Sequence, residues 1–243
     1  MKITEFDKSR KFIENQYQTV KSLVDEEQSL KLYSELKDVY CSESSKQVGK
    51  GKAIKYYFEH VRLFINPHDP FADLADVCNT PLGLRDEEEK GYRQEETLAM
   101  VLQQEGAVFA ESDFGHTMPD WNSVFSFGIP GMVKRAEECL KKTALSEKQR
   151  EFYLSVKYAY EGLLIYTRRL FQKASETLSD NARFAAQNLE ALVKGAPETL
   201  AQAMQLYFIY YTGQHFVEGE NLRSLGALDE ILYLKSLEGE ITI

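Results

Sequence analysis

The side chains best suited to chemistry gather in one short stretch of the chain. Glu111, Asp113, His116 and Asp120 place three carboxylates and one imidazole within ten residues. Both groups are ligands for manganese and iron, so one interpretation is a metal-dependent hydrolase built on this cluster. The spacing follows no established ligand rule, however, and an acidic loop exposed to water has the same composition. The pair of His116 and Asp120 is also typical of an imidazole held in place by a carboxylate.

A second group of short polar side chains lies towards the other end of the sequence. Asn221 and Ser224 stand in a glycine-containing stretch, where short polar residues also serve ordinary turns. Asp229 follows them and is typical of a carboxylate at the start of a helix. Neither group by itself identifies a catalytic residue.

Composition predicts a soluble protein of the cytoplasm. The 243 residues carry 29 Lys and Arg against 38 Asp and Glu, and this acidic balance without a basic stripe disfavours nucleic acid and anionic membranes. Three widely spaced cysteines, Cys41, Cys78 and Cys139, argue against a disulfide framework and a structural zinc site. The first residues lack the apolar region of a secretory signal. The longest apolar stretch, 206–211, is too short to span a bilayer.

Most of the sequence has the three- and four-residue apolar spacing of amphipathic helices. A capping box at Ser146 and Gln149 opens the clearest of them. Pro130 is suited to a first helical turn, Gly195 to a C-cap, and residues 66–70 to a turn. An ordered loop is expected over 112–131, and a short extended segment over 106–111. The expected helices cover 12–40, 52–64, 86–102, 130–144, 146–178, 181–193, 228–234 and a long stretch that begins at Pro197.

Two segments resemble the glycyl-radical enzymes of the pyruvate formate-lyase family. Residues 115–121, Gly-His-Thr-Met-Pro-Asp-Trp, look like the family's Gly-His-x-x-Pro-Asp-aromatic segment, and 124–131 look like the helix start that follows it. Residues 197–206 are similar to the family's proline-led, buried Ala-Leu-Gln-Leu helix. Residues 218–233, which include Asn221 and Ser224, are similar to its Glu-x-Asn…Ser-x-Gly loop.

Two further segments agree with the same family. Residues 65–71 are like its upstream Ile-x-Pro-x-Asp-x-Phe turn, and the helix with Phe152, Tyr166 and Arg169 is of the kind that the family places between the two main segments. The resemblance therefore extends over residues 53–233, in the family's order and spacing.

The chain departs from the family pattern near its end and in its reactive loops. Ala227 stands where the family usually has arginine. In the family, a backbone glycyl radical in an Arg-Val-x-Gly-Tyr loop takes a hydrogen atom from the cysteine of a Gly-Cys-x-Glu loop, and the thiyl radical attacks the substrate. Neither loop occurs in this sequence. Gly91 lacks the preceding Arg-Val, and Cys41 follows tyrosine near the opposite end of the chain.

The resemblance implies substrate-facing positions for four residues. His116 is expected to hydrogen-bond a substrate oxygen or to exchange a proton with it. Asp120 accompanies His116, and Asn221 and Ser224 are expected on a loop near the substrate. No catalytic residue, metal ligand or bound cofactor is assigned to this chain. Full-length relatives carry a glycyl radical that is installed by an activase using S-adenosylmethionine and an iron–sulfur cluster.

These patterns predict a mainly α protein with at most one or two short strands. Residues 1–243 are expected to form a single domain, the helical N-terminal portion of the pyruvate formate-lyase-like barrel, truncated before the radical site. The expected function is a substrate-pocket wall in a radical lyase, acyltransferase or dehydratase acting on a small oxygenated metabolite of anaerobic metabolism. The alternative is a non-catalytic helical binding or scaffold protein that retains the architecture.

Three kinds of partner follow from this interpretation. A complementing C-terminal chain would carry the two missing loops, and a radical activase would install the radical. A second copy of the chain is the third, because a truncated barrel is expected to expose an apolar patch around residues 200–211.

Overall fold

The computed structural model describes residues 26–72 and 119–218, together with residues 10, 11, 14, 104, 105, 226, 229 and 233. The two continuous ranges are helical and contain no β-strand, which confirms the prediction of a mainly α fold. The expected segments 86–102 and 106–111 lie outside the described residues. The described helices are α2 (Glu26–Cys41), α3 (Lys46–His60), α6 (Trp121–Leu140), α7 (Glu147–Glu176), α8 (Asp180–Lys194) and α9 (Leu200–Glu218).

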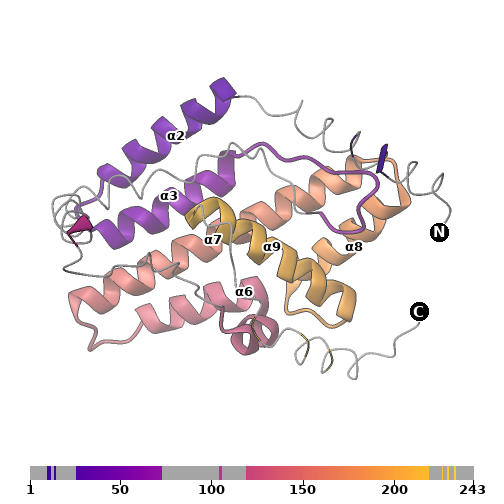
Figure 1. The fold of residues 1–243 in the computed structure, drawn as a ribbon. Coiled ribbons are helices and arrows are strands. Elements are labelled where there is room, and N and C mark those ends of the chain that lie inside the picture. The colour runs from indigo at the N-terminus through magenta and orange to yellow at the C-terminus, as the bar shows by residue number, and fades with distance from the viewer. Residues whose placement is uncertain are drawn as a thin grey trace.

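The longest described helix, α7, lies at the centre of the arrangement (Figure 1). It contacts α3, α6 and α8, while α2 lies against α3 and α9 lies against α8. The capping box predicted at its start is present, since Gln149 N–H donates to Ser146 Oγ and Ser146 N–H donates back to Gln149 Oε1. Its inner face buries Leu163, Tyr166 and Leu170 in the shared hydrophobic core.

Helix α3 begins six residues earlier than the predicted start at Lys52. Gly49 and Gly51, which lie before the predicted start, are helical and buried. A Cβ atom on Gly51 would lie 2.6 Å from the carbonyl oxygen of Ser155, so the glycine permits close contact between α3 and α7. Gly162 does the same from α7, where a Cβ atom would lie 2.7 Å from Cα of Lys55. Helix packing therefore explains these glycines.

The end of α3 is held by an arginine from α7. Arg169 donates from Nη1 to the carbonyl oxygen of Phe58 at 2.7 Å and from Nη2 to that of Val61 at 2.6 Å. Carbonyl groups at a helix C-terminus lack partners within the helix, and a cation there also complements the helix dipole. The helix ends at His60, four residues before the predicted Phe64.

The prediction of a loop over 112–131 is wrong from Trp121 onward, where α6 has already begun. A kink at Gly128, with φ 61° and ψ 178°, divides the helix, and this conformation is open to glycine alone. Pro130 then lies in the first turn of the second part, as its type predicts. A side chain at Gly128 would also collide with Gly195, since a Cβ atom would lie 2.5 Å from that carbonyl oxygen.

The last helix begins at Leu200 rather than at Pro197. Thr199 caps it, because the backbone N–H of Gln202 donates to Thr199 Oγ1 at 3.2 Å. Gly195 ends α8 as predicted, in an extended conformation. Most of α9 is buried or half-buried, and Tyr211 is the exposed large apolar side chain in its described part, with 38% of its surface accessible. The broad exposed patch expected over 200–211 is therefore not found among the described residues.

Within the described residues, none of the helices has the length and apolar character needed to cross a membrane.

A buried glutamine ties the turn after α3 to α9. The turn predicted at 66–70 is present, with Asp69 N–H donating to the Asn66 carbonyl oxygen. Gln205 is fully buried, donates from Nε2 to the carbonyl oxygen of Ala72 at 2.8 Å and accepts the Ala72 N–H at 3.0 Å. One side chain thus satisfies both backbone groups of a residue 133 positions away.

Replacing Gln205 should destabilise the fold strongly, because its one side chain is the partner of two buried backbone groups. Gln205→Leu leaves the N–H and C=O of Ala72 buried without partners, and we expect a loss of about 2–4 kcal/mol in the free energy of unfolding. Urea denaturation followed by circular dichroism measures it. Gln172→Leu, at an exposed position of α7, is the control and should change stability by less than about 0.5 kcal/mol. Equal effects of the two changes would contradict the clamp.

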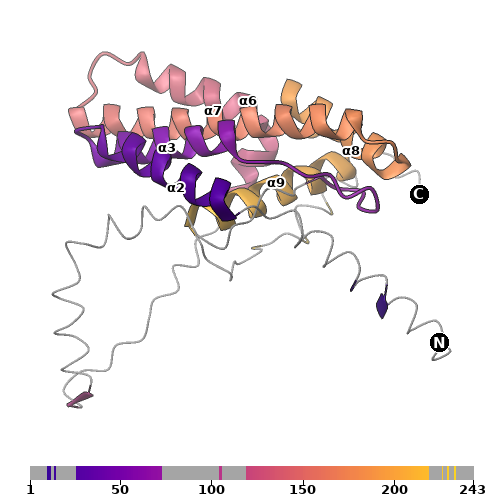
Figure 2. The same ribbon diagram turned by 90° about the horizontal axis from the view of Figure 1, so that it is seen from above.

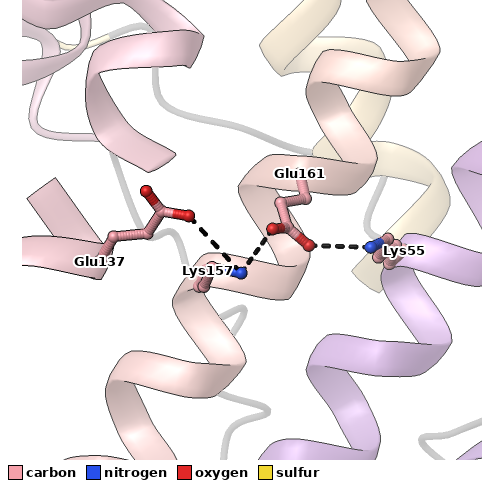
Figure 3. A network of polar contacts seen from close by, with 4 residues as sticks. All are labelled: Lys55, Glu137, Lys157 and Glu161. Carbon is pink, nitrogen blue, oxygen red and sulfur yellow. Dashed lines mark hydrogen bonds and ion pairs between the residues drawn. The ribbon is translucent and has the colours of Figure 1, made fainter. Parts of the chain in front are cut away.

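A charged network of four residues joins α3, α6 and α7 (Figure 3). The carboxylate of Glu161 in α7 forms ion pairs with Nζ of Lys55 in α3, at 2.8 Å, and with Nζ of Lys157, at 2.6 Å. Nζ of Lys157 also lies 3.7 Å from Oε1 of Glu137 in α6. Burial acts to raise the pKa of Glu161, but the two ammonium groups outweigh it, so its pKa lies below the ordinary value. The carboxylate is therefore charged throughout the neutral range.

This network should make stability depend on acid. The pKa of Glu161 is lower in the folded state than in the unfolded state. Its charged carboxylate therefore stabilises the fold fully above the unfolded-state pKa of about 4.3, and this stabilisation is lost as pH falls through the folded-state pKa. At pH 7 the free energy of unfolding of the wild type should exceed that of Glu161→Gln by about 1 kcal/mol, and this difference should disappear towards pH 2. Urea denaturation over that pH range tests it. Glu190→Gln, in the more exposed pair with Lys194, should give less than about 0.5 kcal/mol.

Candidate functional site

Of the four predicted substrate-facing residues, the structure describes one. His116, Asn221 and Ser224 lie outside the described residues, and Asp120 lies immediately before α6. The described part of the candidate site therefore consists of the start of α6, which follows His116 in the sequence, and the C-terminal half of α9, which precedes Asn221 and Ser224.

Asp120 is the N-cap of α6. Its Oδ1 accepts the backbone N–H of Ser123 at 3.3 Å, and its Oδ2 accepts the Ser123 hydroxyl at 2.6 Å. These two hydrogen bonds lower the pKa of the Asp120 carboxyl, and the positive charge of Arg135 contributes further. The side chain is exposed, so a charged, partly engaged carboxylate faces water directly after the segment that contains His116.

Trp121 anchors the start of α6 in the core. It is 5% exposed, and its ring lies 5.1 Å from that of Tyr207 and 5.7 Å from that of Tyr210, both on α9. Phe125, one turn further along α6, completes the contact at 5.4 Å. Aromatic rings at these separations attract one another beyond the area they bury. The aromatic residue of the sequence motif is thus a packing residue that fixes α6 against α9.

This contact brings the two motif-bearing parts of the chain together. Asp120 and Trp121 directly follow the segment with His116, and α9 continues for two turns beyond Tyr210 to Glu218, just before Asn221. An α-helix rises 1.5 Å per residue, so the end of α9 lies roughly 12 Å along the helix axis from the Trp121 contact. Segments about one hundred residues apart in the sequence are therefore neighbours (Figure 2).

A small apolar cavity lies behind this contact, between α3, α7 and α9. It is open to solvent on one side and has a volume of about 170 Å³. Its walls are formed by Ile54, Phe58, Ala159, Tyr160, Leu163, Tyr210, Gly213 and Gln214. No cavity-lining residue was predicted from the sequence.

Two tyrosines of this cavity are strongly influenced by burial. Burial raises the pKa of Tyr210 well above its ordinary value and raises that of Tyr160 as well. The charges of Arg135 and Asp120 act on Tyr160 in opposite directions. Both phenols therefore stay protonated at neutral pH and do not act as bases there.

The metal interpretation rests on residues that are largely outside the described ranges. Glu111, Asp113 and His116 are not described, and the described residues hold no group of three or more His, Cys, Asp or Glu side chains placed for a metal ion. Among the described cysteines, Cys41 is an exposed free thiol and Cys139 a half-buried one.

The sequence profile of the pyruvate formate lyase-like family matches residues 84–235, more than half of the chain. The chain belongs to this family. The matched range contains both motif-bearing segments and the helices between them, which agrees with the resemblance found from the motifs. No curated protein sequence matches the chain significantly.

Solved structures of glycyl radical enzymes share the fold. A glycyl radical enzyme from Archaeoglobus fulgidus aligns with a TM-score of 0.66 at 17% identity, covering 88% of this chain and 35% of its own. The B12-independent glycerol dehydratase from Clostridium butyricum aligns with 0.64 at 15% identity, covering 87% and 34%. A Roseburia inulinivorans protein of 1,2-propanediol dehydration aligns with 0.67 at 12% identity, covering 87% and 33%. This chain spans about a third of the length of these proteins.

The role of Asp120 can be separated into capping and charge. Asp120→Asn keeps an N-cap acceptor and should leave the melting temperature near that of wild type, whereas Asp120→Ala should lower it by about 2–4 °C. Because the folded-state pKa of Asp120 is lowered, the contribution of its charge is lost as pH falls through that pKa. Differential scanning calorimetry at pH 7 and pH 3 measures both effects. Equal melting temperatures for all three proteins would contradict the capping role.

Proposed function

We propose that this chain is the helical N-terminal part of a glycyl-radical enzyme and forms one wall of its substrate pocket. His116 hydrogen-bonds a substrate oxygen or exchanges a proton with it, and Asn221 and Ser224 approach the substrate from the second loop. Asp120, as a helix cap with an exposed carboxylate, orients the segment that carries His116. The reactive cysteine and the radical glycine come from polypeptide beyond the 243 residues considered.

The observation that carries this proposal is the contact of Trp121 with Tyr207 and Tyr210. It joins the start of α6 to α9 within a chain that belongs to the pyruvate formate lyase-like family. In the sequence, the segment with His116 directly precedes α6, and the segment with Asn221 and Ser224 follows α9. A single wall built from both segments is the arrangement that this packing favours.

Dehydration of a small hydroxylated compound is the reaction class that we favour. Several of the structural relatives are described as dehydratases, acting on glycerol, on trans-4-hydroxy-L-proline or in 1,2-propanediol dehydration. A histidine beside the departing hydroxyl group suits that reaction, because loss of the group as water requires a proton. Cleavage of a carbon–carbon bond with acyl transfer is the alternative within the same family.

Two partners are part of this proposal. The polypeptide that carries the Gly-Cys-x-Glu and Arg-Val-x-Gly-Tyr loops completes the fold, whether it continues this chain or is separate. An activase using S-adenosylmethionine and an iron–sulfur cluster installs the radical on that polypeptide. Both follow from the family resemblance and from the share of the relatives' length that this chain spans.

Reconstitution tests the proposal. The chain is combined without oxygen with the polypeptide of the same genome that carries both loops and with its activase, and glycerol and 1,2-propanediol are supplied. We expect a glycyl-radical signal in electron paramagnetic resonance and dehydrated product. His116→Ala should keep the radical signal and reduce product formation about 100-fold or more, as expected for loss of an acid–base group.

His68→Ala is the matched control, because His68 is exposed in the turn after α3, at a variable position of the 65–71 segment and outside both main motif segments. It should change neither the signal nor the product. A radical-bearing complex whose turnover is unaffected by His116→Ala would remove His116 from the pocket wall. Failure of the two polypeptides to associate, or absence of any partner with both loops, would disprove the proposed function as a whole.

A further inference from the structure

We propose that Trp121, Tyr207 and Tyr211 conduct an oxidising equivalent, a missing electron, from the buried indole to the surface of the protein. We call these three residues the aromatic chain. Its role is independent of the substrate-pocket wall proposed above, because it depends only on contacts within the described residues.

The three rings of the aromatic chain lie next to one another in order. The centre of the Trp121 indole lies 5.1 Å from that of the Tyr207 ring. The Tyr207 ring in turn stacks on that of Tyr211 at 6.4 Å, with an angle of 22° between the planes. Centre-to-centre distances of about 4.5–7 Å are those of aromatic rings in contact. Because indole and phenol are the aromatic side chains that lose an electron most easily, an electron can cross the chain in two short steps.

The exposure of the rings increases along the aromatic chain. Trp121 is 5% exposed, Tyr207 is half-buried and Tyr211 has 38% of its surface accessible. A phenol releases its proton when it gives up an electron, so a tyrosyl radical forms most easily where water can take that proton. Water reaches Tyr211, and the oxidising equivalent therefore ends there.

The buried indole is a poor place for the oxidising equivalent to remain. Nε1 of Trp121 is buried and has no hydrogen-bond acceptor among the described residues. An oxidised Trp121 therefore keeps its proton and is a buried cation, and an unpaired charge in apolar surroundings is costly. The oxidised indole accordingly takes an electron from a neighbouring phenol.

A second tyrosine in contact with the indole explains why the route runs through Tyr207. Tyr210 lies 5.7 Å from Trp121, but it is 7% exposed, and its hydroxyl makes no hydrogen bond of good geometry to the described residues. The polar group beside it is the phenol of Tyr160, and burial raises the pKa of both tyrosines. A neutral phenol is too weak a base to accept the proton of Tyr210, so oxidation of Tyr210 is disfavoured.

Electrons and protons balance for an oxygen-centred oxidant of the alkoxyl-radical class. The radical takes one electron from Trp121 and one proton from water and becomes an alcohol. Trp121 takes an electron from Tyr207, Tyr207 takes one from Tyr211, and Tyr211 releases its phenolic proton to water. Trp121 and Tyr207 return to their original forms. The net change is the transfer of one hydrogen atom from the Tyr211 hydroxyl to the radical, which directs oxidation away from the core to an exposed residue.

Photo-oxidation of the sole tryptophan tests the aromatic chain in the full 243-residue protein. A laser pulse at the long-wavelength edge of protein absorption, where indole absorbs and phenol does not, excites Trp121. A cobalt(III) ammine complex in the solution captures its electron irreversibly. Transient absorption then follows the indole radical and the tyrosyl radical, which absorb at different wavelengths. In the wild type we expect the indole-radical signal to decay as the tyrosyl signal rises.

Two tyrosines of α9 that contact the same indole provide the variant and its matched control. Tyr207→Phe keeps the ring and removes the oxidisable phenol, so the tyrosyl signal should be lost and the indole radical should persist. Tyr210→Phe makes the same chemical change on the buried side and should leave both signals as in the wild type. Circular dichroism shows whether each variant is folded.

Trapping of the radical locates the end of the route. A nitroso spin trap followed by mass spectrometry should place the radical at residue 211 in the wild type and in Tyr210→Phe, but not in Tyr207→Phe. A tyrosyl signal that rises equally fast in Tyr207→Phe would overturn the inference, and so would its loss in Tyr210→Phe. Absence of a tyrosyl radical in the wild type, or trapping at a residue other than 211, would also overturn it. None of these results bears on the pocket wall, which concerns His116, Asn221 and Ser224.

Discussion

The backbones of α3 and α7 approach so closely that side chains are excluded at two points of their contact. Gly51 lies against Ser155, and Gly162 lies against Lys55, each at a distance that a Cβ atom would make impossible. This approach places Arg169 within reach of the last carbonyl groups of α3 and places Lys55 beside Glu161. The remaining helices pack around the resulting pair, and the apolar cavity lies where α9 crosses it.

The connection from this pair to the candidate site runs through α9. Gln205 attaches α9 to the turn after α3, and Trp121 attaches α9 to the start of α6. Helix α9, which carries no Asp, Glu, Lys or Arg before Glu218, therefore links the turn after α3 to the start of α6.

Several elements were predictable because their signals are local. The capping box at Ser146 and Gln149 satisfies N–H groups within one turn, and the structure reproduces it. The C-cap at Gly195, the turn at Asn66 and the position of Pro130 are of the same kind. The predictions failed where a residue type had two explanations. Gly49 and Gly51 lie outside the predicted helix because glycine is a poor helix former, but they are part of α3 and are its contact points with neighbouring helices.

The amino-acid sequence by itself determined the helical class, the family and the identity of the motif residues His116, Asp120, Asn221 and Ser224, because periodicity and ordered motifs survive without coordinates. Only the tertiary structure shows which helices are in contact. The packing role of Trp121 and the clamp between Gln205 and Ala72 depend on partners that α9 brings close from distant positions in the sequence. Sequence spacing carries no information on contacts across a hundred residues, since only the folded chain brings such residues within a few ångströms.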